Sequence, residues 1–268
     1  MRESETANRA YLSPLTEDDY WYSATVRDLR PLNRMLSRLE LLPAARRPRS
    51  LVDLGCGLGG LTLHVASRLG ISEPIGVESV PAILERASSR GVKAIQADLN
   101  FDPVPLTDAS IDLVTSFGVF EHLQLYDNLM TEAARILKDG GWFLLSMPNL
   151  GSYVNRVALL LGFQPQEVEV SSRVSAGVLP FYRHSWTSGA PLGHGHPGEA
   201  HLHAATLRCM RELLVRFGLT VVAAQGLSPG SGSRAVKLLD AIFGHVPALS
   251  RRFIILAERM PRQQLEGL

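Results

Sequence analysis

The chain of 268 residues has only two cysteines, Cys56 and Cys209. A pair this sparse cannot form the disulfide framework of a small secreted protein, so the sequence favours a reducing compartment. Residues 1–30 carry several acidic side chains and lack the continuous apolar core of a signal peptide. The longest apolar runs, such as Val157–Leu161, are too short to span a bilayer. We therefore expect a soluble, cytoplasmic protein without stable membrane insertion.

An excess of charge of either sign is also lacking. The 27 basic and 26 acidic residues leave a formal charge of +1, so no positive field is available to hold nucleic acid or an anionic membrane. Hydrophobic residues make up 46% of the chain, which excludes intrinsic disorder as its dominant state. The composition therefore predicts one large domain or two small ones, with no nucleic-acid partner.

From Ser50 onward, short apolar runs alternate with helical patterns, as in a sheet built from strand, helix, strand units. The predicted strands are Leu51–Leu54, Pro74–Glu78, Val92–Ala97, Ile111–Phe117, Trp142–Ser146, Thr220–Ala224 and Phe253–Ala257. The spacing of apolar residues predicts helices over roughly Thr25–Leu41, Leu61–Leu69, Pro81–Arg90, Asn128–Leu137 and Ala205–Phe217. Residues 149–204 lack strand periodicity and are rich in glycine, aromatic residues and histidine, and long irregular segments of this kind are usually functional or mobile.

The strongest local signal lies at the end of the first predicted strand. Asp53 precedes a turn that contains Gly55, Gly57 and Gly59, and a helical pattern follows. Glycine is needed where the backbone must approach a ligand closely or take a positive φ. On its own, this pattern is shared with helix starts that bind no ligand and with nicotinamide dinucleotide sites.

Two further carboxylates narrow these alternatives. Glu78 ends the second predicted strand, where a carboxylate can accept hydrogen bonds from both hydroxyls of a ribose. Asp98 follows the third strand, where a carboxylate can accept from an adenine amino group, a role that a dinucleotide enzyme does not require. Asp53 would face a cationic amine or brace the loop, and its charge would oppose a pyrophosphate. The predicted ligand is an adenosine with a positively charged tail.

At these residues the chain resembles the class I S-adenosylmethionine-dependent methyltransferases, from about Ser50 to Gly141 and more weakly to Glu258. The resemblance rests on the glycine loop, the acids at the strand ends, the stretch 111–123 and Leu137-Lys138-Asp139-Gly140-Gly141. Within that class, Glu121-His122-Leu123 and Met147-Pro148-Asn149 are similar to a small-molecule group that includes ubiquinone-pathway O-methyltransferases.

The resemblance implies an α/β, Rossmann-like fold. Its seven-stranded sheet would have helices on both faces, with the last strand antiparallel and inserted between the fifth and sixth. Residues 1–49 would form an N-terminal helical segment that closes the cofactor pocket, and residues 50–258 would form the methyltransferase core. Within the core, residues 149–204 would be a cap that recognises the acceptor, and residues 259–268 would be a tail.

The resemblance also implies S-adenosyl-L-methionine as cofactor and assigns roles by position. Gly55 and Gly57 would let the backbone pass the methionine part, and Glu78 would bind the ribose. Asp98 and the Leu99 backbone would hold the adenine. Further candidate contacts are the backbone of Phe117, just after the fourth strand, and Arg34 or Arg38 toward the methionine carboxylate.

Methyl transfer to a hydroxyl requires a general base within hydrogen-bond reach of the acceptor. His122 is the first candidate, because the turn after the fourth strand lies at the carboxyl edge of the sheet, where ligands bind in open α/β folds. The alternative is that Glu121 and His122 only brace this loop. A histidine of the later cap, such as His201, could instead be the base.

Five histidines and an acid fall close together in the cap. They are His184, His194, His196, Glu199, His201 and His203. This spacing matches none of the usual zinc patterns, so we expect a glycine-rich cap and no metal. Aromatic residues in the same segment could line a pocket for a flat or apolar acceptor, although core packing explains them equally well: Tyr153, Phe163, Phe181, Tyr182 and Trp186.

Other functions differ in specific features. A nucleic-acid amino-methyltransferase is expected to carry Asn or Asp followed by Pro-Pro after the fourth strand, whereas this chain reads Ser116-Phe117-Gly118-Val119. The sequence predicts a methyltransferase that acts on a small-molecule acceptor, such as a natural product of secondary metabolism, at oxygen in preference to nitrogen or carbon. A protein that binds S-adenosylmethionine without catalysis would carry the same cofactor motifs.

Overall fold

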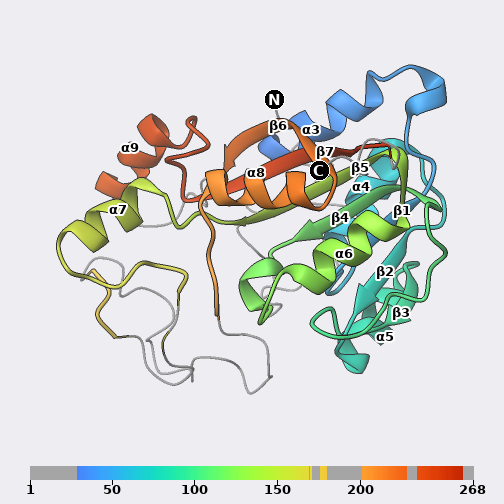
Figure 1. The fold of residues 1–268 in the computed structure, drawn as a ribbon, viewed down its shortest axis with the longest axis horizontal. Helices are drawn as coiled ribbons and strands as arrows, with labels where there is room; N and C mark the ends of the chain where they lie inside the picture. Colours follow the sequence, from blue (N-terminus) through green and yellow to red (C-terminus); the bar gives the residue numbers. More distant parts are fainter. Residues whose placement is uncertain (1–28, 169, 171–175, 180–200, 228–233, 262–268) are drawn as a thin grey trace.

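The computed structural model describes residues 29–168, 170, 176–179, 201–227 and 234–261. In this part of the chain, seven strands form one sheet in the order β3-β2-β1-β4-β5-β7-β6 (Figure 1). The strands are β1 (Leu51–Leu54), β2 (Ile75–Glu78), β3 (Lys93–Gln96), β4 (Ile111–Phe117), β5 (Leu137–Pro148), β6 (Leu219–Leu227) and β7 (Arg252–Arg259). β7 pairs antiparallel with both β5 and β6, and the other pairs are parallel. The predicted fold class is therefore confirmed.

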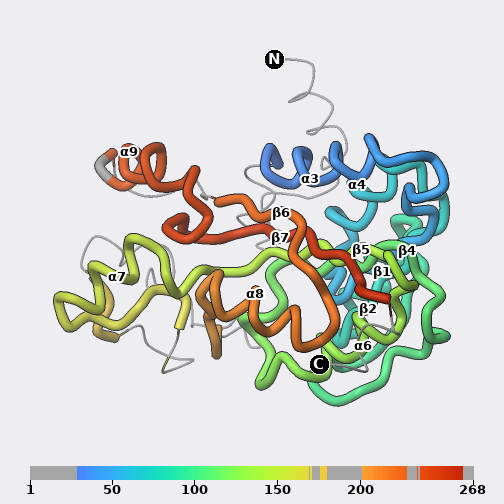
Figure 2. The backbone as a smooth tube through the Cα atoms, turned by 45° about the horizontal axis from the view of Figure 1, so that its top comes forward, coloured from blue at the N-terminus to red at the C-terminus, as the bar shows by residue number. Residues whose placement is uncertain are grey.

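Helices cover both faces of the sheet. Figure 2 shows α3 (Arg30–Glu40) and α4 (Gly60–Leu69) on one side of the strands, and α6 (Asp127–Ile136) and α8 (Leu207–Arg216) on the other. α5 (Pro81–Ser89) packs against β2 and β3, with Leu84 and Ala87 beside Leu63 of α4. The layers arise because alternate residues of a strand point to opposite faces, as Val114 and Leu113 of β4 do.

α3 is the described part of the predicted N-terminal helix, and residues 1–28 lie outside the described residues. Its buried face contains Leu32, Met35 and Leu36, which pack with residues of α4 and the sheet. His64 of α4 places Nε2 2.8 Å from Asn33 Oδ1 of α3. Burial lowers the pKa of His64 to about 4, so this contact holds a neutral ring at neutral pH.

Two helices were not predicted. α7 (Tyr153–Leu160) lies at the start of the segment 149–204, whose sequence lacks strand periodicity, and α9 (Arg234–Phe243) precedes β7. α7 begins where the Ser152 side chain accepts a hydrogen bond from the Asn155 amide, which is a typical N-cap. The two helices pack together through the rings of Tyr153 and Phe243, whose centroids lie 5.2 Å apart. Their pattern is hidden because several apolar residues of both are exposed, among them Leu160 and Leu238.

β5 begins at Leu137, five residues before the predicted start, because Leu137 pairs with Ile111 ahead of a register shift. A short 3-10 turn, η1 (Ala44–Arg46), precedes β1, and a second, η2 (Phe120–His122), follows β4. Among the described residues, no helix is both long enough and apolar enough to cross a membrane.

Candidate active site

The glycine loop connects β1 to α4 at the carboxyl edge of the sheet. Gly55, Gly57 and Gly59 all have positive φ, of 80°, 51° and 77°. A Cβ on Gly55 would lie 2.3 Å from Cγ2 of Val119, so the loops that follow β1 and β4 approach each other too closely for any side chain there. A Cβ on Gly57 would meet no protein atom within 4 Å. The loop thus packs against the protein at Gly55 and presents open backbone at Gly57.

Glu78, at the end of β2, contacts this loop directly. Its Oε2 accepts a hydrogen bond from the Gly57 amide at 3.2 Å. Its Oε1 accepts from the amides of Ser79 and Val80, at 2.8 and 3.1 Å. The Ser79 hydroxyl also donates to Oε1, at 3.3 Å. Each carboxylate oxygen has two lone pairs, so Oε2, which has a single donor, can accept one further hydrogen bond, for example from a ribose hydroxyl.

Asp98 and Leu99 follow β3 and are joined to the loop after β4. Asp98 Oδ1 accepts from both the backbone and the side-chain amide of Asn100, at 2.9 Å each. Asn100 Oδ1 in turn accepts from the Gln124 amide at 2.8 Å. Leu99 is buried, and its carbonyl accepts from the side-chain amide of Asn128. The predicted adenine residues therefore belong to a hydrogen-bonded connection between two loops of the same edge.

Asp53 connects β1 to α4 and β4 through buried hydrogen bonds. The side chain is 2% exposed, and its carboxylate accepts from the hydroxyls of Thr62 on α4 and Thr115 on β4. Burial raises the pKa of Asp53, and the two hydroxyl donors oppose that effect. Of the two roles that the sequence analysis left open, these contacts favour bracing the loop over facing a cationic amine.

The side chains of two other predicted cofactor residues, Phe117 and Arg38, do not lie at the glycine loop. Phe117 is the last residue of β4 and is buried against the α3 side of the sheet, so its side chain belongs to the core. Arg38 is exposed on α3. Its neighbours Ser37 and Glu40 contact Arg68 in the last turn of α4, whereas the glycine loop precedes the first turn of that helix. The structure does not bring Arg38 to the glycine loop.

The two predicted catalytic histidines lie together. His122 belongs to η2, and His201 opens the described chain that leads into α8. Their ring centroids are 4.8 Å apart, with an angle of 64° between the ring planes. The segment 201–206, which leads into α8, is held against η2, because the Leu202 amide donates to the Glu121 carbonyl at 2.7 Å. His122 and His201 are 79 positions apart in the sequence, and the fold brings their rings into contact.

Three charged groups surround this histidine pair. Glu121 is 1% exposed, and its Oε1 accepts from Nη2 of Arg252 at 2.7 Å. Nδ1 of His201 lies 2.7 Å from Oε2 of Glu167, and Nη1 of Arg252 lies 4.0 Å from the same oxygen. Burial would lower the pKa of His201, but the Glu167 carboxylate raises it above the ordinary value. Burial would raise the pKa of Glu167, but His201 and Arg252 lower it to about 2.

Glu167 and Arg252 were missed by the sequence analysis. For Arg252 a signal existed: the last strand was predicted to be antiparallel, so its first residue must lie at the carboxyl edge of the parallel strands. Arg252 is indeed paired with Pro148, the last residue of β5. For Glu167 there was no signal, since it lies in an irregular segment.

Some of the histidines and aromatic residues singled out in the segment 149–204 lie among the described residues. His203 donates from Nε2 to the Gln124 carbonyl at 2.7 Å and so anchors the segment 201–206. Tyr153 and Phe163 pack in a small core with Leu179. His184, His194, His196, Glu199, Phe181, Tyr182 and Trp186 lie outside the described residues. The side-chain atoms of Glu121, His122 and His201 that could ligate a metal lie within 4.8 Å of one another. Arg252 forms an ion pair with Glu121 and so already balances its charge. The absence of a metal stays a prediction.

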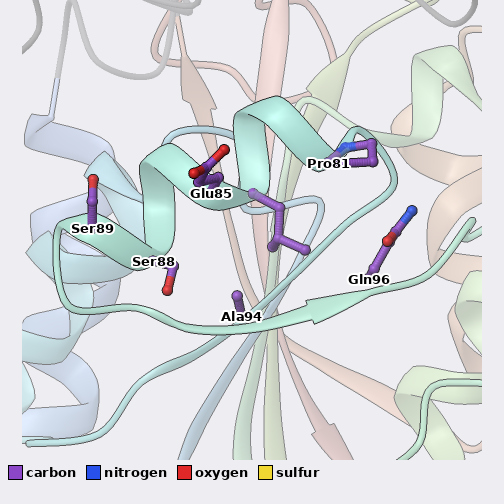
Figure 3. Close-up of a pocket in the computed structure, with 7 residues that line it drawn as sticks. Pro81, Glu85, Ser88, Ser89, Ala94 and Gln96 are labelled. Carbon is purple, nitrogen blue, oxygen red and sulfur yellow. The ribbon is translucent and has the colours of Figure 1, made fainter.

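A pocket of about 520 Å³ lies outside this site, between α5 and the edge strand β3 (Figure 3). No predicted site residue belongs to its lining, which consists of Pro81, Leu84, Glu85, Ser88, Ser89, Ala94 and Gln96.

The sheet order, the antiparallel β7 and the glycine loop with its strand-end acids define a methyltransferase of class I type. In agreement, the family model described as a methyltransferase domain matches residues 27–224. The chain therefore belongs to this methyltransferase domain family, and the prediction of a methyltransferase that uses S-adenosylmethionine is confirmed at the level of the family.

Curated relatives match part of the chain. The trans-aconitate 2-methyltransferase of Rhodococcus jostii is 34% identical over 120 residues, which are 44% of this chain and 44% of that protein. The ajmaline N-methyltransferase of Rauvolfia serpentina is 27% identical over 145 residues, which are 51% of this chain and 48% of that protein. The match thus covers less than half the length of these two relatives.

Solved structures agree with the fold. An S-adenosylmethionine-dependent methyltransferase from Mesorhizobium loti superposes with a TM-score of 0.54 at 17% identity, covering 88% of this chain and 98% of that one. At this identity the likeness shows the fold alone.

The brace at Asp53 can be tested by removing one donor. Thr115→Val keeps the shape of the side chain but leaves one oxygen of a buried carboxylate without its partner, so the free energy of unfolding should fall by about 1–3 kcal/mol. Urea unfolding at neutral pH measures this. Ser116→Ala is the control on the same strand, because the Ser116 hydroxyl is buried without a hydrogen-bond partner among the described residues. Equal losses in the two variants would contradict the brace.

Proposed function

We propose that this protein transfers a methyl group from S-adenosylmethionine to an oxygen atom of a small-molecule acceptor, with a histidine of the His122–His201 pair as general base. The observation that carries the proposal is that the glycine loop, the strand-end acids and the histidine pair occupy one edge of the sheet. Membership of the methyltransferase domain family supports the same activity.

The residues at this edge fit the cofactor. Open backbone at Gly57 leaves room for the methionine part, and the Glu78 carboxylate beside it can accept a ribose hydroxyl. The loop of Asp98 and Leu99 would hold the adenine. When bound, S-adenosylmethionine supplies an electrophilic methyl group on a positively charged sulfur.

The protein's part in the chemistry is placement and proton removal. Displacement at a methyl group is in line, so the acceptor oxygen must be held opposite the sulfur in a dry site. As the oxygen forms its bond to the methyl carbon, the bond from carbon to sulfur breaks and leaves its electron pair on sulfur. The hydroxyl proton passes to a ring nitrogen of the base. The segment 149–204 would recognise the acceptor, as a cap over this edge.

A second candidate is transfer to nitrogen, which the ajmaline N-methyltransferase relative favours. A neutral amine attacks through its own lone pair and needs no base before the reaction.

For transfer to oxygen, the proposed subclass is the small-molecule group that includes ubiquinone-pathway O-methyltransferases, because of Glu121-His122-Leu123.

Cofactor binding at the glycine loop is tested by comparing Gly57, which lies in the loop, with Gly70, which lies at the other end of α4. Gly57 and Gly70 both have positive φ, and a Cβ on either would meet no protein atom within 4 Å. Gly57→Ala and Gly70→Ala should therefore lose similar stability, roughly 1–2 kcal/mol each. In calorimetric titration with S-adenosylhomocysteine, we expect Gly57→Ala to bind roughly tenfold or more weakly, about 1.4 kcal/mol, and Gly70→Ala to bind as the unaltered protein does. Equal affinities in all three proteins would overturn the loop's assignment.

The base is tested with His122→Gln and His201→Gln, with His245→Gln as control, because His245 is exposed and lies outside this site. Loss of the general base should lower kcat about 10²- to 10⁴-fold while affinity for S-adenosylhomocysteine is kept. Turnover is followed by mass spectrometry as the gain of one methylene equivalent on a panel of phenols, tricarboxylates and tertiary amines. Full turnover of a hydroxyl acceptor in both variants would exclude both histidines. Carboxylates are already ionised and need no base, so they report methyl transfer alone, and turnover of amines alone would favour the second candidate.

A further inference from the structure

The contact between Glu167 and His201 joins an acid of the cap to a candidate base. His201 is 8% exposed, and its Nδ1 lies 2.7 Å from Oε2 of Glu167. A carboxylate accepts and does not donate, so the contact requires a proton on Nδ1. With Nδ1 used in this way, Nε2 is the ring nitrogen that can take up a proton from an acceptor.

The backbone around Glu167 is fixed in an uncommon conformation. Glu167 has a φ of +68°, one of two positive values among the described residues other than glycine. A side chain in this left-handed region costs free energy and persists only where neighbouring contacts determine it. Those contacts are present: the Gln166 amide donates to Asn155 Oδ1 at 2.8 Å, and Nε2 of Gln164 donates to the Val168 carbonyl at 3.0 Å.

The turn that bears Glu167 is hydrogen-bonded to α7 through Asn155. Asn155 is 2% exposed, and its side-chain amide donates to the Asn149 carbonyl at the end of β5. The turn that bears Glu167 is thus connected through one buried side chain to the sheet. Strained backbone held by buried contacts is more common at functional sites than elsewhere.

Charged groups around the pair favour an ionised Glu167. Arg252 places Nη1 4.0 Å from the Glu167 carboxylate and donates from Nη2 to Glu121. The rings of His122 and His201 are in contact in a T-shaped arrangement. The groups that face His201 are therefore two carboxylates, one guanidinium and one further imidazole. Arg252 offsets the second carboxylate and makes proton transfer onto Glu167 unfavourable.

We propose that Glu167 is a positioning residue that holds His201 with Nδ1 protonated and Nε2 directed to the acceptor. This inference rests on the proposed function, because it gives His201 the role of base. Glu167 itself touches neither cofactor nor acceptor in this account. It acts as the third group that orients a base, as in other acid, histidine and nucleophile arrangements.

The test is Glu167→Gln, which keeps the size of the side chain and an oxygen acceptor but removes the charge. The His201 ring signal is followed by NMR across pH and assigned with His201→Gln. Loss of the carboxylate should shift the titration of His201 to lower pH, because that carboxylate raises its pKa. Glu212→Gln is the control, since Glu212 pairs with exposed Arg208 on α8. An unchanged titration in Glu167→Gln would overturn the pairing without any reference to turnover.

Kinetics supply the second readout. In the unaltered protein kcat/KM should rise with pH as His201 loses its proton, and in Glu167→Gln this rise should move to lower pH. We expect kcat to fall by about tenfold or more with little change in KM, because the base loses its orientation. A shifted NMR titration with unchanged kcat in both Glu167→Gln and His201→Gln would overturn the role of His201 as base, and the positioning role with it. A loss of kcat in His201→Gln but not in Glu167→Gln would overturn the positioning role alone.

Discussion

The buried carboxylate of Asp53 is the interaction on which the rest of the site depends. Its hydrogen bonds to Thr62 and Thr115 connect β1 to α4 and to β4 at the level where both strands end. The glycine loop follows β1, and η2 follows β4, so this side chain braces the two paired strands from which both halves of the edge start. Where the two loops meet, a Cβ on Gly55 would lie 2.3 Å from Cγ2 of Val119, so only glycine fits there.

The second half of the site depends on ionic contacts between segments distant in sequence. Arg252 begins β7 and reaches Glu121 in η2, while Glu167 comes from the turn fixed on α7. Buried charges are tolerated when each has a partner, and here every charge faces one of opposite sign. The turn that bears Glu167 is in this way attached to the edge through His201.

The sequence predicts those features that local pattern determines. All seven strands, the antiparallel β7 and the position of Glu78 beside the glycine loop follow from apolar periodicity, glycine placement and family resemblance. Glu167 could not be predicted, because its meeting with His201 bridges an irregular segment and depends on tertiary contacts of Asn155. The position of Arg38 could not be predicted either, because the apolar pattern predicts the helix α3 but not how it lies along α4.

The most direct test is a crystal structure of the protein with S-adenosylhomocysteine. We expect the ribose to contact the Glu78 carboxylate, the adenine to lie beside Asp98 and Leu99, and the sulfur to face the His122–His201 pair. A ligand bound elsewhere, for example in the pocket between α5 and β3, or a sulfur that faces away from both histidines, would contradict it.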